Sequence, residues 1–160
     1  MSTDRAALLR LRVEVGRDVA TFRSLLDDLS SRRAVMATGD PVVLGYAAIT
    51  LHRAYTALES AFERVCRTLE GSLPAGRDSH QALLSDMALD LPGLRPPVLR
   101  VETAQSLAGL LRFRHFVRHA YAVSWDPDRI VEVLDAAEAA WPALRDDLEA
   151  FASFLDGVTA

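Results

Sequence analysis

The sequence predicts an all-α protein, an antiparallel bundle of four or five helices. Apolar residues recur every three or four positions along most of the chain, which is the period of an amphipathic helix. No segment shows the period-two alternation of apolar and polar residues that marks a strand. The chain has 160 residues, 50% of them hydrophobic and 25% charged, so we expect a single globular domain over residues 1–160.

The first two predicted helices are long. The first runs from Asp4 to about Arg33, and its apolar residues return at steps of three and four. These residues are Leu8, Leu11, Val15, Val19, Phe22, Leu25 and Leu29. Asp40 and Pro41 then form a helix start, with the aspartate as N-cap and the proline at the first helical position. The second helix follows and is expected to end near Gly71.

Three further helices are predicted in the second half of the chain. A short helix is expected from a cap at Asp78 through Leu89, and the paired prolines of the following "DLPGLRPP" stretch exclude helix. A fourth helix is predicted from residue 101 or 102 to Tyr121, and a fifth starts at Asp126 and Pro127. Helices of about 30 residues span roughly 45 Å. They must therefore pack lengthwise against the fourth and fifth helices, as in a bundle.

Charge and cysteine content limit the possible functions. The net charge of −4 argues against a generally basic nucleic-acid binder, so a polyanion would have to meet a local patch. The chain contains no lysine, and every one of its 18 basic residues is an arginine, whose planar fork suits phosphate. Charges interrupt the apolar run at the N-terminus, and Cys66, the lone cysteine, is expected to be a small buried residue. We therefore expect a cytoplasmic protein without a membrane partner.

One stretch, "LLRFRHFVRHAY" at 110–121, differs from the rest of the chain. It combines a core-facing apolar stripe with basic, imidazole and phenol groups within ten residues. These are Arg112, Arg114, His115, Arg118, His119 and Tyr121. The spacing of Arg114, His119 and Tyr121 resembles the R-x-x-x-x-H-x-Y motif of the HEPN superfamily, in particular the HepT-like ribonuclease toxins. The resemblance extends to the preceding proline-containing loop and to the "WDPDRI" stretch that follows.

The resemblance implies a function and roles for these residues. Arg114 and His119 would be the catalytic pair of a metal-independent endoribonuclease without cofactors, the toxin of a toxin–antitoxin pair. Tyr121 would accept AMP from a partner nucleotidyltransferase of the MNT type, which silences the toxin. Family members are typically homodimers whose motif helices face each other. We expect RNA-binding or supporting roles for the neighbouring side chains, Arg112, His115 and Arg118.

The chemistry of these residue types agrees with that implication. A histidine near its ordinary pKa of about 6.5 moves a proton at neutral pH, and an arginine fork holds two phosphate oxygens. His119 comes five residues after Arg114, which places the two side chains about 140° apart around the axis of an ideal helix. A straight helix therefore does not direct both side chains at one phosphate. Either the helix loosens near His119, or a two-fold axis completes the site. His115 departs from the Asn or Asp that commonly follows the motif arginine, which would either weaken the activity or add a titratable group.

Other interpretations remain open from the sequence. His115 and His119 have the i, i+4 spacing of a zinc pair, but no further ligands accompany them and no metal site is predicted. The arginines of the stretch could form a solvated face paired with acids such as Glu102 or Asp126. His52 and His80 are expected to be surface or hydrogen-bonded core histidines. The alternative function is a non-catalytic HEPN bundle that acts as a binding partner or regulatory subunit of a nucleotidyltransferase.

Overall fold

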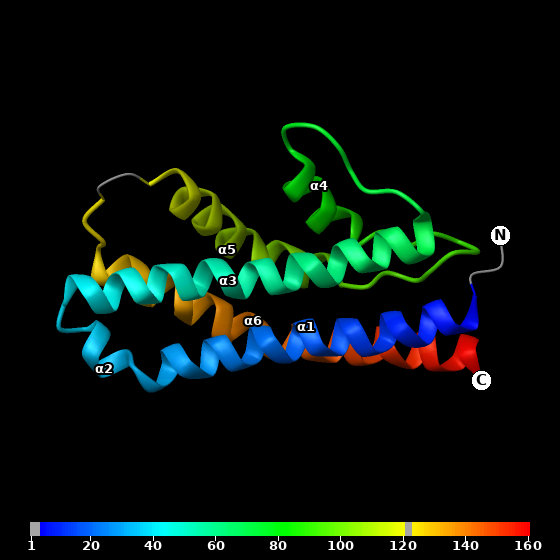
Figure 1. Ribbon diagram of the computed structural model, residues 1–160, viewed down its shortest axis with the longest axis horizontal. Helices are drawn as coiled ribbons and strands as arrows, with labels where there is room; N and C mark the ends of the chain where they lie inside the picture. Colours follow the sequence, from blue (N-terminus) through cyan, green and yellow to red (C-terminus); the bar gives the residue numbers. More distant parts are fainter. Residues whose placement is uncertain (1–3, 121–122) are drawn as a thin grey trace.

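The computed structural model describes residues 4–120 and 123–160 and confirms the all-α bundle (Figure 1). No strand occurs among these residues. The helices are α1 (Arg5–Ser31), α2 (Arg33–Met36), α3 (Pro41–Val65), α4 (Ser79–Asp86), α5 (Val101–His119) and α6 (Pro127–Thr159), and α3 continues into a π-helical turn at Cys66–Glu70.

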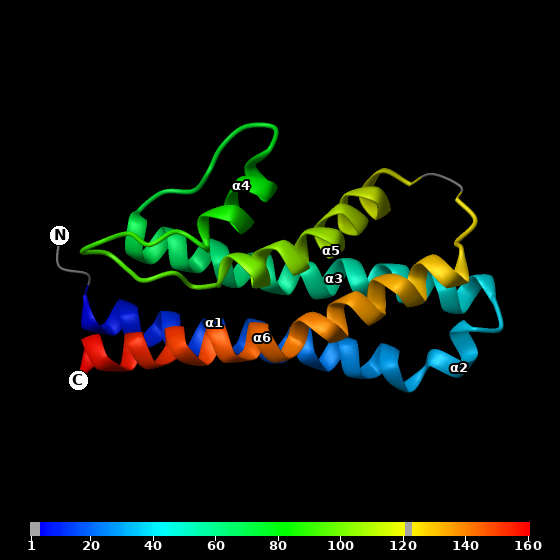
Figure 2. The same ribbon diagram turned by 180° about the vertical axis from the view of Figure 1, so that it is seen from behind.

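Four of the helices form the bundle. α1 and α5 run in the opposite direction to α3 and α6, and both views show these helices side by side (Figures 1 and 2). α1 packs against α3 and α6, and α5 also packs against α3 and α6. α4 lies outside this bundle, over α3 and α5. The buried core runs along the bundle, and its largest enclosed side chains include Tyr55, Phe22, Phe62 and Phe151.

The predicted Asp-Pro helix starts are confirmed. The Asp40 carboxylate accepts hydrogen bonds from the backbone N–H groups of Val42 and Val43 at 2.8 and 3.3 Å, and Pro41 follows it as the first residue of α3. Asp126 accepts a bond from the N–H of Asp128 at 3.0 Å, ahead of Pro127 in α6. These carboxylates satisfy backbone donors that the first turn of a helix leaves without partners.

The short helix starts after Asp78 as predicted but ends earlier than predicted. Asp78 precedes α4, but its side chain makes no capping hydrogen bond. α4 ends at Asp86 rather than at Leu89. The reason is a tighter turn, because the N–H of Ala88 bonds to the Ser85 carbonyl and that of Leu89 to the Asp86 carbonyl, three residues back.

Two buried polar anchors fix α4 and α5 against the bundle. The buried Arg95 donates to Glu70 Oε1 at 2.8 Å and to the Asp86 carbonyl at 3.0 Å, which ties the loop after α4 to the end of α3. At the start of α5, the Asp147 carboxylate of α6 accepts from the backbone N–H of Arg100 at 2.9 Å and from its Nε at 2.6 Å. The position of α5 is therefore set from its first residue.

In the part of the chain that the structure describes, none of the helices is both long enough and apolar enough to cross a membrane.

Candidate functional site

The predicted site lies at the C-terminal half of α5. The helix ends at His119 and not at Tyr121, because Ala120 adopts an extended backbone with φ −82° and ψ 113°. His119 therefore occupies the last helical position, with its side chain exposed. Tyr121, the expected AMP acceptor, lies outside the described residues.

Arg114 is buried, in contrast to its neighbours in sequence. Its side chain is 6% exposed, and Nη1 donates to Glu59 Oε2 of α3 at 2.7 Å. The guanidinium also lies over the Tyr55 ring, 5.7 Å from its centroid. The interpretation of Arg114 as part of a solvated face, paired with Glu102 or Asp126, is therefore wrong. A buried ion pair with Glu59 takes its place.

Glu59 joins two elements of the site through one oxygen. Its Oε2 contacts both Arg114 Nη1 and His80 Nδ1 of α4, each at 2.7 Å. The His80 ring in turn meets the His115 ring edge-on, with 5.3 Å between the centroids. A chain of contacts from Arg114 through Glu59 and His80 to His115 thus connects α5, α3 and α4.

The remaining predicted residues face solvent. Arg112, Arg118 and His119 are exposed, and His115 is half-buried. Neither Arg112 nor Arg118 forms an ion pair with another residue in the described ranges. The sequence between Glu102 and Asp126 contains no acid. The exposed surface of this half of α5 is therefore a local cationic patch on an acidic protein.

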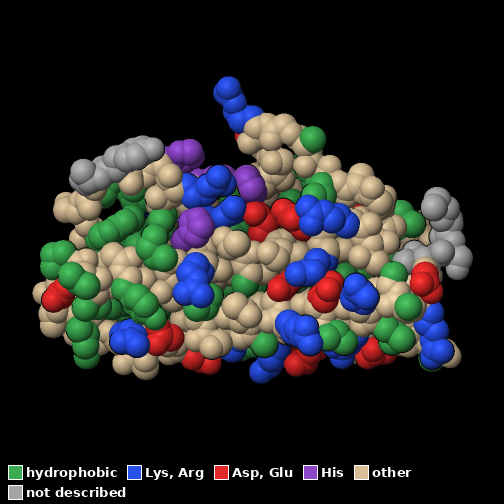
Figure 3. Space-filling model, viewed as in Figure 1, with side chains coloured by type: hydrophobic (Ala, Val, Ile, Leu, Met, Phe, Trp, Pro, Cys, Tyr) green, Lys and Arg blue, Asp and Glu red, His purple; other side chains and the backbone are tan. Residues whose placement is uncertain are grey.

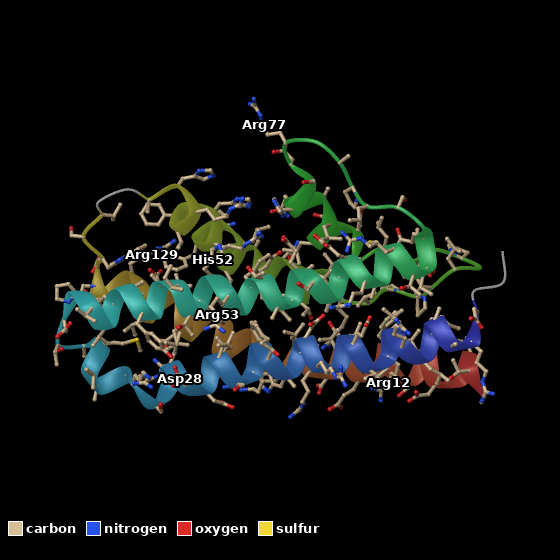
Figure 4. The ribbon with its side chains drawn as sticks, viewed as in Figure 1. Arg12, Asp28, His52, Arg53, Arg77 and Arg129 are labelled. Carbon is tan, nitrogen blue, oxygen red and sulfur yellow. The ribbon has the colours of Figure 1, made fainter. Side chains whose placement is uncertain are left out.

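The histidines gather on one face. Figure 3 shows their side chains close together among arginines, over α5 and the parts of α3 and α4 next to it, and Figure 4 places His52 and Arg53 on α3. Burial lowers the pKa of His115 below its ordinary value, and the nearby His80, Arg114 and Arg118 lower it further. Burial also lowers the pKa of His52, and the charges of Arg114 and Arg118 act in the same direction. These two imidazoles are therefore largely neutral at pH 7 and able to accept protons.

The structure brings the predicted residues together only in part. His115, Arg118 and His119 share the exposed end of α5, whereas the Arg114 guanidinium points to Glu59 in the interior. Within the described ranges, no group of three or more His, Cys, Asp or Glu side chains is arranged to hold a metal ion. His115 contacts His80 instead of forming a ligand set with His119.

Sequence reasoning missed Glu59 and the role of His80. A signal for Glu59 was present, because this acid follows Tyr55 by four residues and precedes Phe62 by three on the core-facing stripe of α3. A carboxylate at such a position requires a buried partner. No comparable signal marked His80, since its contact with Glu59 depends on how α4 folds back over α3.

The fold and this cluster define an all-α helical bundle with basic and imidazole groups on one helix. The chain belongs to the HepT-like protein family, whose model matches residues 47–155. The match covers most of α3 and the following helices into the last turns of α6, so it includes the whole cluster. Neither the comparison with curated proteins nor that with solved structures found a match.

Proposed function

We propose that this protein is a metal-independent endoribonuclease and the toxin of a toxin–antitoxin pair. The observation that carries the proposal is the cationic patch at the end of α5, where an exposed histidine lies beside arginines that have no acidic partner among the described residues. On such a surface the arginines provide positive charge for a phosphodiester, and the histidine provides a proton acceptor. Membership of the HepT-like family supports the same activity.

The proposed reaction is an internal transesterification of RNA. His119 removes the proton of a ribose 2′-hydroxyl, whose oxygen then attacks the adjacent phosphorus. The bond from phosphorus to the 5′-oxygen breaks, and that oxygen takes up a proton. The products are a 2′,3′-cyclic phosphate and a free 5′-hydroxyl. The protein supplies proton transfer and stabilisation of the charge that develops on the phosphate oxygens.

Arginine donors would provide that stabilisation. Glu59 engages Arg114 through Nη1, and Nη2 forms no hydrogen bond to another residue of the described chain. We assign Nη2 of Arg114 to a phosphate oxygen, with the exposed Arg112 and Arg118 as RNA-binding residues. Because Arg114 points inward and His119 outward, the pair acts on one phosphate only if a second protomer completes the site.

The direct test is RNA cleavage by the purified protein in the presence and absence of a chelator. We expect equal rates in both, and products that end in a 2′,3′-cyclic phosphate. Cleavage that the chelator abolishes would contradict the proposal and would favour a zinc site built on His115 and His119.

The dimer that the proposal requires would form through the end of α5. Phe116 is 52% exposed there and packs edge-on against Trp125, with 6.0 Å between the ring centroids. We expect light scattering to show a dimer at micromolar concentration and a Phe116→Glu variant to be monomeric, because the charge would be buried in an apolar interface. Arg10→Glu, far from α5 on the first helix, is the matched control and should remain dimeric. A monomeric wild-type protein would contradict the composite site.

The proposed antitoxin is a nucleotidyltransferase of the MNT type that transfers AMP to Tyr121. The modification would add an anionic phosphodiester two residues after His119 in the sequence, which would compete with an RNA phosphate for the arginines of α5. Mass spectrometry after co-expression with such an enzyme should show one added AMP, and the addition should be absent from Tyr121→Phe. AMP on the phenylalanine variant would place the acceptor elsewhere.

The second candidate function is a non-catalytic binding partner or regulatory subunit of the nucleotidyltransferase. The ion pair between Arg114 and Glu59 favours it, because a carboxylate at 2.7 Å offsets the charge of the motif arginine. A protein that binds the nucleotidyltransferase but leaves RNA intact would identify this function.

A further inference from the structure

A pocket separates the N-terminal end of α4 from the middle of α5. It has a volume of about 330 Å³ and is lined by His80 and Gln81 from α4 and by Leu111, Arg112 and His115 from α5. The preceding loop contributes Arg77 and Asp78, and the Arg77 side chain points away from the protein into solvent (Figure 4). The volume lies at the lower end of the range for small-molecule sites, enough for a phosphate group with its sugar.

His80 is held in a defined orientation at this pocket. Its Nδ1 lies 2.7 Å from Glu59 Oε2, which also accepts from Arg114, so the hydrogen-bond pattern assigns the proton to Nδ1. The other ring nitrogen, Nε2, is then the one left for a ligand. Glu59 is itself fixed by Arg114 and is 7% exposed, so this carboxylate has little freedom to turn away. The side chain of His80 is 30% exposed, on the side of the pocket.

The charges around the pocket favour an anion. Arg112 lines it and forms no ion pair within the described part of the chain. Burial lowers the pKa of His115, the charges of His80, Arg114 and Arg118 lower it further, and Glu59 acts in the opposite direction. Asp78 is the acid in the lining, and it is exposed. A bound anion would relieve the repulsion at His115 and favour its protonated form.

We propose that this pocket is a phosphate-binding subsite, in which Arg112 and His115 donate hydrogen bonds to the phosphate group of a nucleotide. His80 donates from Nε2 when both of its ring nitrogens carry protons, and Glu59 is the positioning residue for His80. The choice of RNA as the source of that phosphate rests on the proposed ribonuclease function. His115 and His119 are four residues apart, about 6 Å along the helix. The subsite would therefore hold the phosphate next to the one that is cleaved.

The experiment is an NMR titration of the four imidazoles in the 160-residue chain. Two probes are used: inorganic phosphate, and a dinucleotide whose 2′-O-methyl groups keep the phosphodiester but prevent attack. We expect both probes to shift the His80 and His115 resonances. Arg112→Gln and His80→Gln should each weaken binding of the dinucleotide by about tenfold or more, the usual effect of losing a hydrogen bond to a charged group. His52→Gln removes an imidazole outside the pocket and should bind as tightly as wild type.

The pH dependence of dinucleotide affinity tests whether His115 contacts the phosphate, because a purely structural role of His115 would not produce it. A phosphodiester stays a monoanion, so any change in its affinity between pH 6 and 8 comes from the protein. Affinity should fall as the pH rises, because the imidazole of His115 loses the proton it donates, and the fall should be smaller in His115→Gln. Glu59→Gln should weaken binding under conditions where circular dichroism shows the variant to be folded, because a neutral amide oxygen holds His80 less strongly than a carboxylate does.

The outcomes separate this proposal from the ribonuclease function. Unmoved His80 and His115 resonances with both probes, or unchanged affinity in Arg112→Gln and His80→Gln, would overturn the subsite whether or not RNA is cleaved. Binding of inorganic phosphate alone would overturn the RNA source and assign the pocket to a terminal phosphate monoester. If the protein binds the dinucleotide as expected but cleaves no RNA, the subsite is supported and the proposed ribonuclease function is contradicted.

Discussion

Replacing His119 by alanine is expected to lower the rate of RNA cleavage by about 10²–10⁴-fold, the usual contribution of a positioned proton-transfer group. The side chain is exposed at the last turn of α5, so its removal opens no cavity and leaves no buried group without a partner. The variant should therefore fold as the wild type does, with the same circular dichroism and the same unfolding midpoint. The measurement is the initial rate on a single RNA under conditions where the wild-type rate is proportional to enzyme.

Two companion variants show whether the loss is specific. His52→Ala removes another imidazole of the same face and should keep nearly the full rate, and His115→Ala should lose less than His119→Ala. For the motif arginine, Arg114→Lys is a more specific substitution than Arg114→Ala. It keeps a positive charge beside Glu59 but removes the planar guanidinium that binds two phosphate oxygens. Undiminished cleavage by His119→Ala would remove the proposed mechanism.

The fold was largely predictable because its determinants are local. The period of apolar residues and the two Asp-Pro starts depend on neighbours within a few positions, and they located the first residues of α1, α3, α5 and α6 to within about two residues. The errors lie at ends without such a signal. α4 stops at Asp86 rather than at Leu89, and α5 stops two residues early where Ala120 adopts an extended backbone.

The site was predictable as a stretch but not as a set of contacts. Arg114 follows Leu107, Leu110 and Leu111 at steps of seven, four and three, which already places it on the buried face of α5. The motif spacing indicates the chemistry of Arg114 but carries no information on its burial. Glu59 accepts hydrogen bonds from Arg114, 55 positions away in the sequence, and from His80, 21 positions away. These contacts therefore depend on tertiary packing.

Glu59→Ala is expected to reduce the free energy of unfolding by about 3–5 kcal/mol, the usual cost of removing one partner of a buried ion pair. The pair is nearly closed to solvent, with Arg114 6% and Glu59 7% exposed, and Arg114 Nε already lacks a hydrogen-bond partner among the described residues. The substitution would leave the cation buried without an opposite charge and His80 without its acceptor. Urea unfolding followed by circular dichroism measures the change.

Two further variants identify burial of the charge as the cause. Asp135→Ala breaks the exposed ion pair with Arg33, in which the side chains are 59% and 38% exposed, and should cost about 1 kcal/mol or less. A double variant, Glu59→Met with Arg114→Met, removes both charges and fills the space with apolar atoms. It should recover most of the lost stability, because apolar replacement of a buried pair is often neutral. It should nevertheless cleave no RNA under the proposed mechanism.

Two outcomes would contradict this account. A Glu59→Ala variant as stable as wild type would contradict the buried ion pair. A double variant no more stable than Glu59→Ala would show that the lost stability comes from packing and not from the unpaired charge.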